Sequence, residues 1–298
     1  MLRKSISDRY MSIFIYIILT ILAFVTFYPF WNAAVISFNS GVDTMKGGIT
    51  FWPREFSLDN YKVVFKDSRI LNGFFISVLR TVIGTIMAVM FTAIFAYGIS
   101  KKELVGRNYY MLFCVVTMFF SGGLIPTFLL IRGLGLFNTF WVMVIPGLIS
   151  VWNMIIFRTF FQALPTGLEE SAKMDGCGYW GTFFRIILPL SGPVIATLSL
   201  FTAVYHWNDW FSPSIYISDQ ELLPIQTMLQ QILSSNIMTE QMAQTDSAAA
   251  GRMAAMKSVS TKSLSMATMM VATIPIICVY PFVQKYFVKG VLVGSLKG

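Results

Sequence analysis

Six stretches of this chain are predominantly apolar and contain no Asp, Glu, Lys or Arg. In chain order they are Tyr10–Val42, Thr81–Ser100, Asn108–Ile131, Gly133–Phe157, Ile186–Asn208 and Ser263–Gln284. Each is long enough for a helix to cross the ~30 Å hydrocarbon core of a bilayer at about 1.5 Å per residue. None alternates apolar and polar residues as a barrel strand would, and backbone groups inside a bilayer must be paired. We therefore predict six transmembrane helices.

Composition and charge agree with this pattern. Hydrophobic residues make up 56% of the 298 residues and charged residues 12%, about half the charged share that is usual in soluble domains. With the N-terminus inside the cell, twelve of the 22 Lys and Arg lie on the cytoplasmic side, about twice the outer density per residue. The prediction is an all-α integral membrane protein whose N- and C-termini are both cytoplasmic. Its domains are a cytoplasmic N-terminus, 1–12, and one transmembrane domain, 13–298, which ends in a cytoplasmic tail, 285–298.

Helix breakers interrupt three of the predicted spans. They are Gly122, Gly123, Pro126, Pro146, Gly147, Pro275 and Pro281. Such residues leave backbone groups that must be paired by neighbouring helices or in a hydrated cavity. Either bent helices surround a transport path, or the breakers reflect the ordinary Pro and Gly content of membrane helices.

The predicted cytoplasmic segment from Glu169 to Pro189 is polar and lies between two apolar runs. Thr166 followed by Glu169 has the spacing of a capping box, and Gly176 suits the left-handed position that ends a helix. We predict a helix from Thr166 to Gly176, with Glu169 and Lys173 paired one turn apart. A helix this short is not stable alone in water, so other contacts must hold it.

Six residues of this segment fit the pattern E-A-A-x3-G-x9-I-x-L-P, with Ser171 where Ala is usual. They are Glu170, Ala172, Gly176, Ile186, Leu188 and Pro189. The pattern resembles the cytoplasmic loop by which the membrane subunits of ABC importers contact their ATPase partners. The stretches FSGGLIPTFLL and YPFVQKYFVKGVLVGSLKG, with most of the chain from Ile13 to Gly298, extend the resemblance to the maltose-type carbohydrate permeases. Within them the chain looks closest to the oligosaccharide permeases of Gram-positive bacteria.

The resemblance implies a permease subunit of an ATP-driven ABC importer for a carbohydrate, in the bacterial plasma membrane. Such a subunit is not an enzyme. It pairs with a homologous permease and with two ATPase subunits that bind ATP and Mg, and an extracellular solute-binding protein delivers the sugar. The chain itself has no G-x-x-x-x-G-K-[ST] phosphate loop and no zinc-ligand spacing, so we expect no cofactor or metal in it.

The same resemblance implies two groups of ATPase-contacting residues. In the coupling loop, about 161–189, these are Glu169, Glu170, Ser171, Ala172, Asp175, Gly176, Ile186, Leu188 and Pro189. At the C-terminus they are Lys289, Gly290, Gly294 and Lys297.

Three polar features near the membrane are candidates for a substrate path. At the outer end of the fifth span stand Tyr205, His206, Trp207, Asn208, Asp209 and Trp210. Aromatic rings beside amides and carboxylates suit sugars, but an interfacial aromatic belt, which we favour, collects the same residues. Asn153 either contacts substrate or, as we favour, hydrogen-bonds to another helix. Arg80 is either a functional intramembrane charge or, as we favour, a residue at the outer boundary that snorkels to water.

The longest predicted outer segment runs from about 209 to 262. Apolar residues from Leu222 to Leu233 recur at helical spacing and predict an amphipathic helix on the membrane surface. The resemblance implies that the loop from about Phe211 to Lys262 reaches the solute-binding protein, although residues from about Ile237 to Lys262 are the least similar to the family.

Two other classes of function remain as alternatives. An ion-coupled secondary transporter, the second choice, usually needs intramembrane carboxylates, and no Asp or Glu lies in a predicted span. An intramembrane enzyme needs a nucleophile with a base or a metal, which one His and scattered Ser do not supply. No basic cluster indicates a nucleic-acid partner, and the positions of Cys114, Cys177 and Cys278 predict no disulfide.

Overall fold

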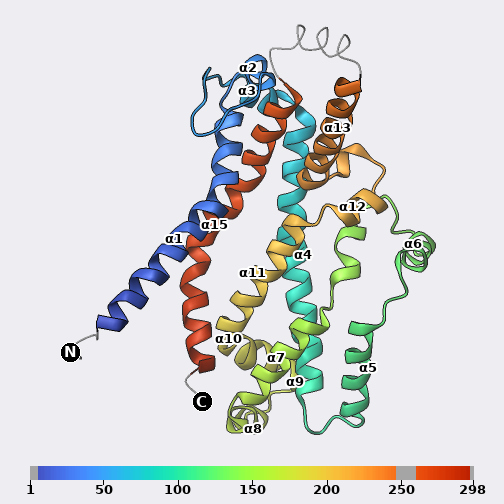
Figure 1. Cartoon of the computed structure of the whole chain (residues 1–298). Helices are drawn as coiled ribbons and strands as arrows, with labels where there is room; N and C mark the ends of the chain where they lie inside the picture. Colours follow the sequence, from blue (N-terminus) through green and yellow to red (C-terminus); the bar gives the residue numbers. More distant parts are fainter. Residues whose placement is uncertain (1–5, 246–259, 296–298) are drawn as a thin grey trace. The chain divides into compact units, whose positions relative to one another are not determined.

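The computed structural model describes residues 6–245 and 260–295, and most of these are helical. Within this part of the chain the only β pairing is an isolated bridge between Asn39 and Phe56. The elements in chain order are α1 (Ile6–Ser37), α2 (Gly41–Met45), α3 (Asp59–Lys66), α4 (Ser68–Ser100), α5 (Arg107–Phe119), α6 (Leu124–Gly133), η1 (Phe140–Met143), η2 (Ile145–Gly147), α7 (Val151–Ala163), α8 (Thr166–Met174), α9 (Tyr179–Thr182), η3 (Phe183–Ile187), α10 (Leu188–Leu190), α11 (Gly192–Asn208), α12 (Phe211–Tyr216), η4 (Gln220–Leu222), α13 (Ile225–Thr245) and α15 (Thr261–Ser295) (Figure 1).

Among the described residues, three helices are long and apolar enough to cross a membrane without a break. These are α1 over Tyr10–Ser37, α4 over Ser68–Ser100 and α15 over Thr261–Cys278. Three further apolar segments are pairs of helices bent at short breaks: 114° between α5 and α6, 47° between η2 and α7, and 82° between α10 and α11. These segments lie where the six apolar runs were predicted. That all six cross the bilayer stays a prediction.

Glycine and proline account for part of this bending. Between α5 and α6 the chain passes through Gly123, whose φ of 84° lies in the left-handed region that glycine adopts without strain. Pro193 stands at the start of α11, where its missing amide hydrogen costs nothing. By contrast, α15 runs through Pro275 and Pro281 without interruption. Proline therefore does not by itself mark a break in this chain.

The chain folds as two compact units. Unit 1 contains residues 1–68 and 229–274, and unit 2 contains residues 69–228 and 275–298.

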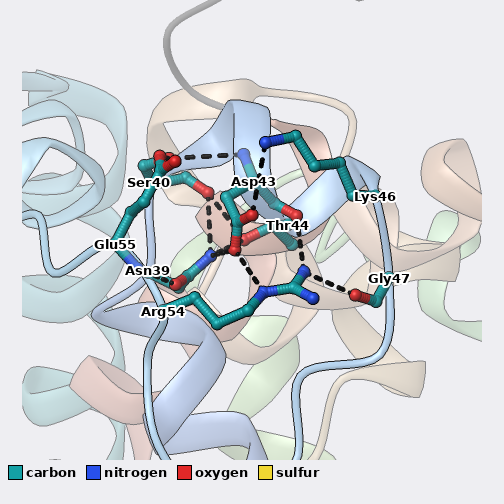
Figure 2. A network of polar contacts seen from close by, with 8 residues as sticks. All are labelled: Asn39, Ser40, Asp43, Thr44, Lys46, Gly47, Arg54 and Glu55. Carbon is teal, nitrogen blue, oxygen red and sulfur yellow. Dashed lines mark hydrogen bonds and ion pairs between the residues drawn. The ribbon is translucent and has the colours of Figure 1, made fainter.

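In unit 1, the loop after α1 folds around the buried carboxylate of Asp43 (Figure 2). Arg54 Nε donates to Asp43 Oδ2 at 2.9 Å, and the amide of Asn39 donates to the same oxygen at 3.1 Å. Asn39 also accepts from the Glu55 backbone amide at 3.0 Å, while the Ser40 hydroxyl caps α2. Arg54 and then Asn39 hold the pKa of the Asp43 carboxyl below its usual range, because both stabilise the charged form.

Asn60 joins three segments of unit 1. Its side-chain amide donates to the carbonyls of Ser37 and Asn39, each at 2.9 Å, and its oxygen accepts from the Ser263 hydroxyl at 2.8 Å. The carbonyls at the end of α1 are thus satisfied by α3, which in turn contacts the first turn of α15. Buried polar groups of this kind need such partners to avoid an uncompensated loss of hydration.

In unit 2, α4 contributes to both buried apolar clusters. The first cluster contains Val89, Ala93, Ala96, Tyr97, Ile99, Cys114, Met154, Phe157, Phe161, Phe183, Ile187 and Leu198. The second contains Ile76, Ile131, Val142, Met143, Tyr216, Ile217, Leu223 and Met228. One unbroken helix of 33 residues, α4, thus packs in both clusters.

Candidate functional site

The helix predicted from Thr166 to Gly176 is present as α8, Thr166–Met174. Its C-terminus follows the Schellman pattern: the Cys177 amide donates to the Ala172 carbonyl at 2.8 Å and the Gly176 amide to the Lys173 carbonyl at 3.0 Å. Gly176 has φ +80°, which confirms the predicted left-handed position. The predicted capping box is wrong, since Pro165 is the N-cap residue and no side chain caps this end.

Two ion pairs connect α8 to the loop that follows α4. Glu169 pairs with Lys101, and Lys173 Nζ lies 3.2 Å from Glu103 Oε1. The predicted Glu169–Lys173 pair is therefore wrong, because each residue finds its partner in the loop. The Tyr179 hydroxyl adds a hydrogen bond to the other Glu103 oxygen at 3.0 Å. We call Lys101, Glu103, Glu169, Lys173 and Tyr179 the α8 cluster.

Electrostatics within the α8 cluster favour its charged forms. The hydrogen bond from Tyr179, and then that from Lys173, lower the pKa of the Glu103 carboxyl. The hydrogen bond to Glu103 raises the pKa of the Lys173 ammonium. Lys101 Nζ also lies 3.8 Å from the centre of the Tyr97 ring, so the cation contacts the C-terminal end of α4 directly. These contacts supply the external support that so short a helix requires.

The α8 cluster borders a small cavity of about 120 Å³. Its lining includes Tyr97, Glu169, Lys173, Cys177 and Tyr179. All three cysteines are free: Cys114 is buried, Cys177 is half-buried and Cys278 is exposed. Cys177 is thus a native thiol at the contact between α4 and α8.

The opposite face of α8 has no cover within the described chain. Glu170, Ser171 and Asp175 are exposed, and the Met174 side chain is 89% exposed. Ala172 is buried, so this residue packs inward and only its neighbours face outward. A helix held on one side, with an apolar and two acidic side chains free on the other, is a surface suited to a protein partner.

The remaining residues of the coupling motif lie in a short irregular helical segment. After α9, residues Phe183–Ile187 form a π-helical turn, which the sequence reading did not predict. Ile186 and Leu188 are half-buried and Pro189 is exposed. The apolar run from Ile186 to Asn208 does not form one straight helix, because the chain turns at Ser191 and α11 begins at Gly192. π-turns are frequent at functional sites, and this one lies between α8 and the bent fifth segment.

Arg80 lies within α4 and does not snorkel at a boundary. The helix begins at Ser68, thirteen residues before the predicted start at Thr81, and Arg80 is only 1% exposed. Its guanidinium pairs with the Asp209 carboxylate and also donates to the Asp209 backbone carbonyl at 2.8 Å. The Ser77 hydroxyl, one turn earlier, accepts from the Ile225 amide at 2.9 Å. We call Ser77, Arg80, Asp209 and Ile225 the Arg80 cluster.

The six candidate residues at the end of α11 divide into two sets. His206 and Trp207 are buried, and Asp209 is held by Arg80, so these three belong to the packing of unit 2. The exposed ones are Tyr205, Asn208 and Trp210. Asn153, in α7, donates to the Thr202 hydroxyl of α11 at 3.3 Å, which is the contact between helices that we favoured.

Two further predictions concern the surface helix expected after Leu222 and the C-terminal ATPase-contacting residues. The apolar positions Leu223, Ile225 and Met228 are buried in protein, so the prediction of a helix lying on the membrane surface is wrong. Lys289, Gly290 and Gly294 continue α15, whereas Lys297 and most of the least family-like segment lie outside the described residues.

Comparison with known proteins identifies a family. The profile described as "Binding-protein-dependent transport system inner membrane component" matches residues 81–293. The polygalacturonan/rhamnogalacturonan transport system permease protein YtcP of Bacillus subtilis (strain 168) is 40% identical over 292 residues, which are 98% of this chain and 99% of YtcP. Protein LplC of the same organism is 40% identical over 274 residues, 92% of this chain and 90% of LplC.

A solved structure has the same fold over nearly the whole chain. It is the crystal structure of a bacterial ABC transporter involved in the import of the acidic polysaccharide alginate. One of its chains superposes with a TM-score of 0.85 and 28% sequence identity, covering 96% of this chain and 100% of that chain.

Proposed function

Because this chain belongs to the inner membrane components of binding-protein-dependent transport systems, we propose that it is the permease subunit of an ATP-driven carbohydrate importer. YtcP is named for polygalacturonan and rhamnogalacturonan, and the superposed structure belongs to an importer of alginate. These names support a carbohydrate substrate, with oligosaccharides as the class. The protein then resides in the bacterial plasma membrane.

The observation that carries the coupling part of this proposal is the arrangement of α8. One face is tied to the chain by the α8 cluster, while Glu170, Met174 and Asp175 face outward. A soluble ATPase subunit with a cleft for a short helix suits this surface. ATP and Mg are bound in that partner, and this chain supplies the contact that transmits the ATPase movement.

The other partners follow from the family. A homologous permease completes the membrane pore, two ATPase subunits bind on the cytoplasmic side, and an extracellular solute-binding protein delivers the sugar. The C-terminal residues Lys289, Gly290, Gly294 and Lys297 are proposed as a second ATPase contact. Tyr205, Asn208 and Trp210 have exposed side chains and so fit both interpretations given above, contact with sugar and an interfacial aromatic belt.

Uptake in whole cells tests this function. A strain lacking this chain is compared with the complemented strain for uptake of labelled oligogalacturonides, alginate oligosaccharides and arabino-oligosaccharides. The proposal expects uptake of at least one of them to depend on this chain and on cellular ATP, and to persist when an ionophore collapses the ion gradients. Uptake that stops with the ionophore while ATP remains high would instead support an ion-coupled secondary transporter.

A further inference from the structure

The unbroken helix α4 and the loop directly after it contact two different segments of unit 2. Near one end, the Arg80 cluster holds the segment from 206 to 228, which contains the end of α11, α12 and the start of α13. At the other end, the α8 cluster holds α8 through the loop directly after Ser100. About 30 Å of helix separates Arg80 from Ser100, at about 1.5 Å per residue. Figure 1 shows α4 as a single helix between these segments.

The contact with the 206–228 segment is close and polar. A Cβ at Gly84 would lie 2.7–2.9 Å from ring atoms of His206, and a Cβ at Gly73 would lie 2.5 Å from Met228 Sδ. Asn72 donates to the Glu221 carbonyl, and Arg80 binds both the side chain and the backbone of Asp209. With the Arg80 side chain 1% exposed, sliding this segment along α4 would leave a buried charge unpaired.

The rest of unit 2 lacks a comparable rigid connection. Its three other apolar segments within 69–228 are bent by 47°, 82° and 114° at their breaks. Breaks of this kind absorb movement, whereas α4 has neither a break nor a proline over its 33 residues. Among the apolar segments within 69–228, α4 is thus the one that has no break.

We propose that α4 transmits the movement of α8 to the 206–228 segment, with Arg80 and Glu103 as the positioning residues at its two contacts. This inference rests on the proposed function, because it takes α8 as the ATPase contact. Arg80 is not assigned to the substrate: its charge is neutralised by Asp209 and its side chain is buried. Coupling of this kind needs an element with both segments fixed to it, and the two clusters provide that.

The test measures amide hydrogen exchange in the assembled complex in nanodiscs, before and after addition of MgATP with orthovanadate. In the wild type we expect exchange to change both in α8 and in residues 206–228, by about fivefold, the lower end of ordinary coupling. Glu103→Lys places like charges together in the α8 cluster. It should keep the response of α8 and lose that of residues 206–228. The double variant Glu103→Lys/Lys173→Glu should recover it.

A second variant addresses the Arg80 cluster without leaving a buried charge. Arg80→Met/Asp209→Leu replaces both partners by apolar side chains, which buried ion pairs often tolerate. It should assemble and should also lose the response of residues 206–228. The control is Asp59→Asn, which removes an exposed ion pair to Lys62 in unit 1. A wild-type response at 206–228 in Glu103→Lys or in Arg80→Met/Asp209→Leu would overturn the inference, and no response of wild-type α8 would instead contradict the proposed function.

Discussion

Glu169 pairs with Lys101 in the loop after α4 and not with Lys173, one turn further along its own helix. Lys173 in turn lies 3.2 Å from Glu103 in the same loop. Two ion pairs therefore join a helix of nine residues to one loop. In one pair the carboxylate lies on α8, and in the other it lies in the loop. An exposed ion pair such as Lys173–Glu103 adds little to stability by itself, but here it stands beside the part-buried Lys101–Glu169 pair and the hydrogen bond from Tyr179.

The end of α8 should require glycine at position 176 because of the backbone conformation there, and not because a side chain would clash with its neighbours. No atom lies within 4 Å of a Cβ built there, but φ is +80°, and a β-branched residue in that region costs about 1–2 kcal/mol. Gly176→Val should therefore unwind the end of α8 and reduce the amount of ATPase subunit that co-purifies with the complex. Gly178→Ala is the matched control, since Gly178 has an ordinary φ of −73° and equal space. Equal ATPase recovery from both variants would contradict this assignment.

Glycine at position 84 should be required because His206 lies against it. A Cβ there would approach the imidazole ring to 2.7 Å, so Gly84→Ala should lower the stability of the purified protein by about 1–3 kcal/mol. Gly98→Ala, in the same helix and with nothing within 4 Å, should be neutral or stabilising by up to ~1 kcal/mol. Thermal unfolding in detergent measures both. The double variant Gly84→Ala/His206→Ser should recover part of the lost stability. If none is recovered, the His206 ring is not the source of the destabilisation.

The loop around Asp43 should weaken in acid. Arg54 and Asn39 lower the pKa of this carboxyl in the folded state, so the stabilisation is complete above its usual value of 3.8 and is lost as the pH falls through the lower folded value. Amide protection of residues 39–55, corrected for intrinsic exchange, should be constant from about pH 7 to 5 and fall only below 3.8. Asp43→Asn should show the lowered protection already at neutral pH. Protection in that variant equal to the wild type would count against the network shown in Figure 2.

Reversal of charge at Glu170 should stop transport and leave the fold intact. The side chain is exposed on the free face of α8, so Glu170→Lys removes no internal contact in the described chain. Membrane insertion and thermal stability should be unchanged, while carbohydrate uptake falls to the level of the strain without this chain. Lys66→Glu, a charge reversal at an exposed residue of α3, is the control and should transport normally. Normal uptake by Glu170→Lys with its ATPase bound would refute the coupling assignment.

The six apolar segments and α8 could be predicted from the sequence because their signals are local. Apolar length marks a membrane segment, and a glycine after a short charged run marks a helix end. The partner of Glu169 could not be predicted in this way. Lys173 stands at the right spacing on the same helix, whereas Lys101 lies 68 residues away and approaches only when α4 and α8 are packed.

The environment of Arg80 could not be predicted from the sequence either. The charge-free run begins at Thr81, which places a minimal span after Arg80, but α4 begins at Ser68. Within this longer helix, Asp209 from another part of the chain neutralises the arginine, and no local pattern indicates that partner. Likewise, the apolar residues from Leu223 to Met228 have the pattern of a membrane-surface helix, and burial against protein produces the same pattern.

A disulfide cross-link at Met174 tests the central claim most directly. Met174→Cys, with Cys177→Ser and Cys278→Ser to remove competing thiols, presents a thiol at the 89%-exposed position of α8. Met45→Cys in α2, on the predicted outer side, is the matched control and is 51% exposed. In complexes purified from membranes, the account predicts a cross-link between position 174 and a cysteine scanned along the ATPase cleft, and none from position 45. Failure of every such cysteine to capture position 174 in an intact, ATP-hydrolysing complex would contradict it.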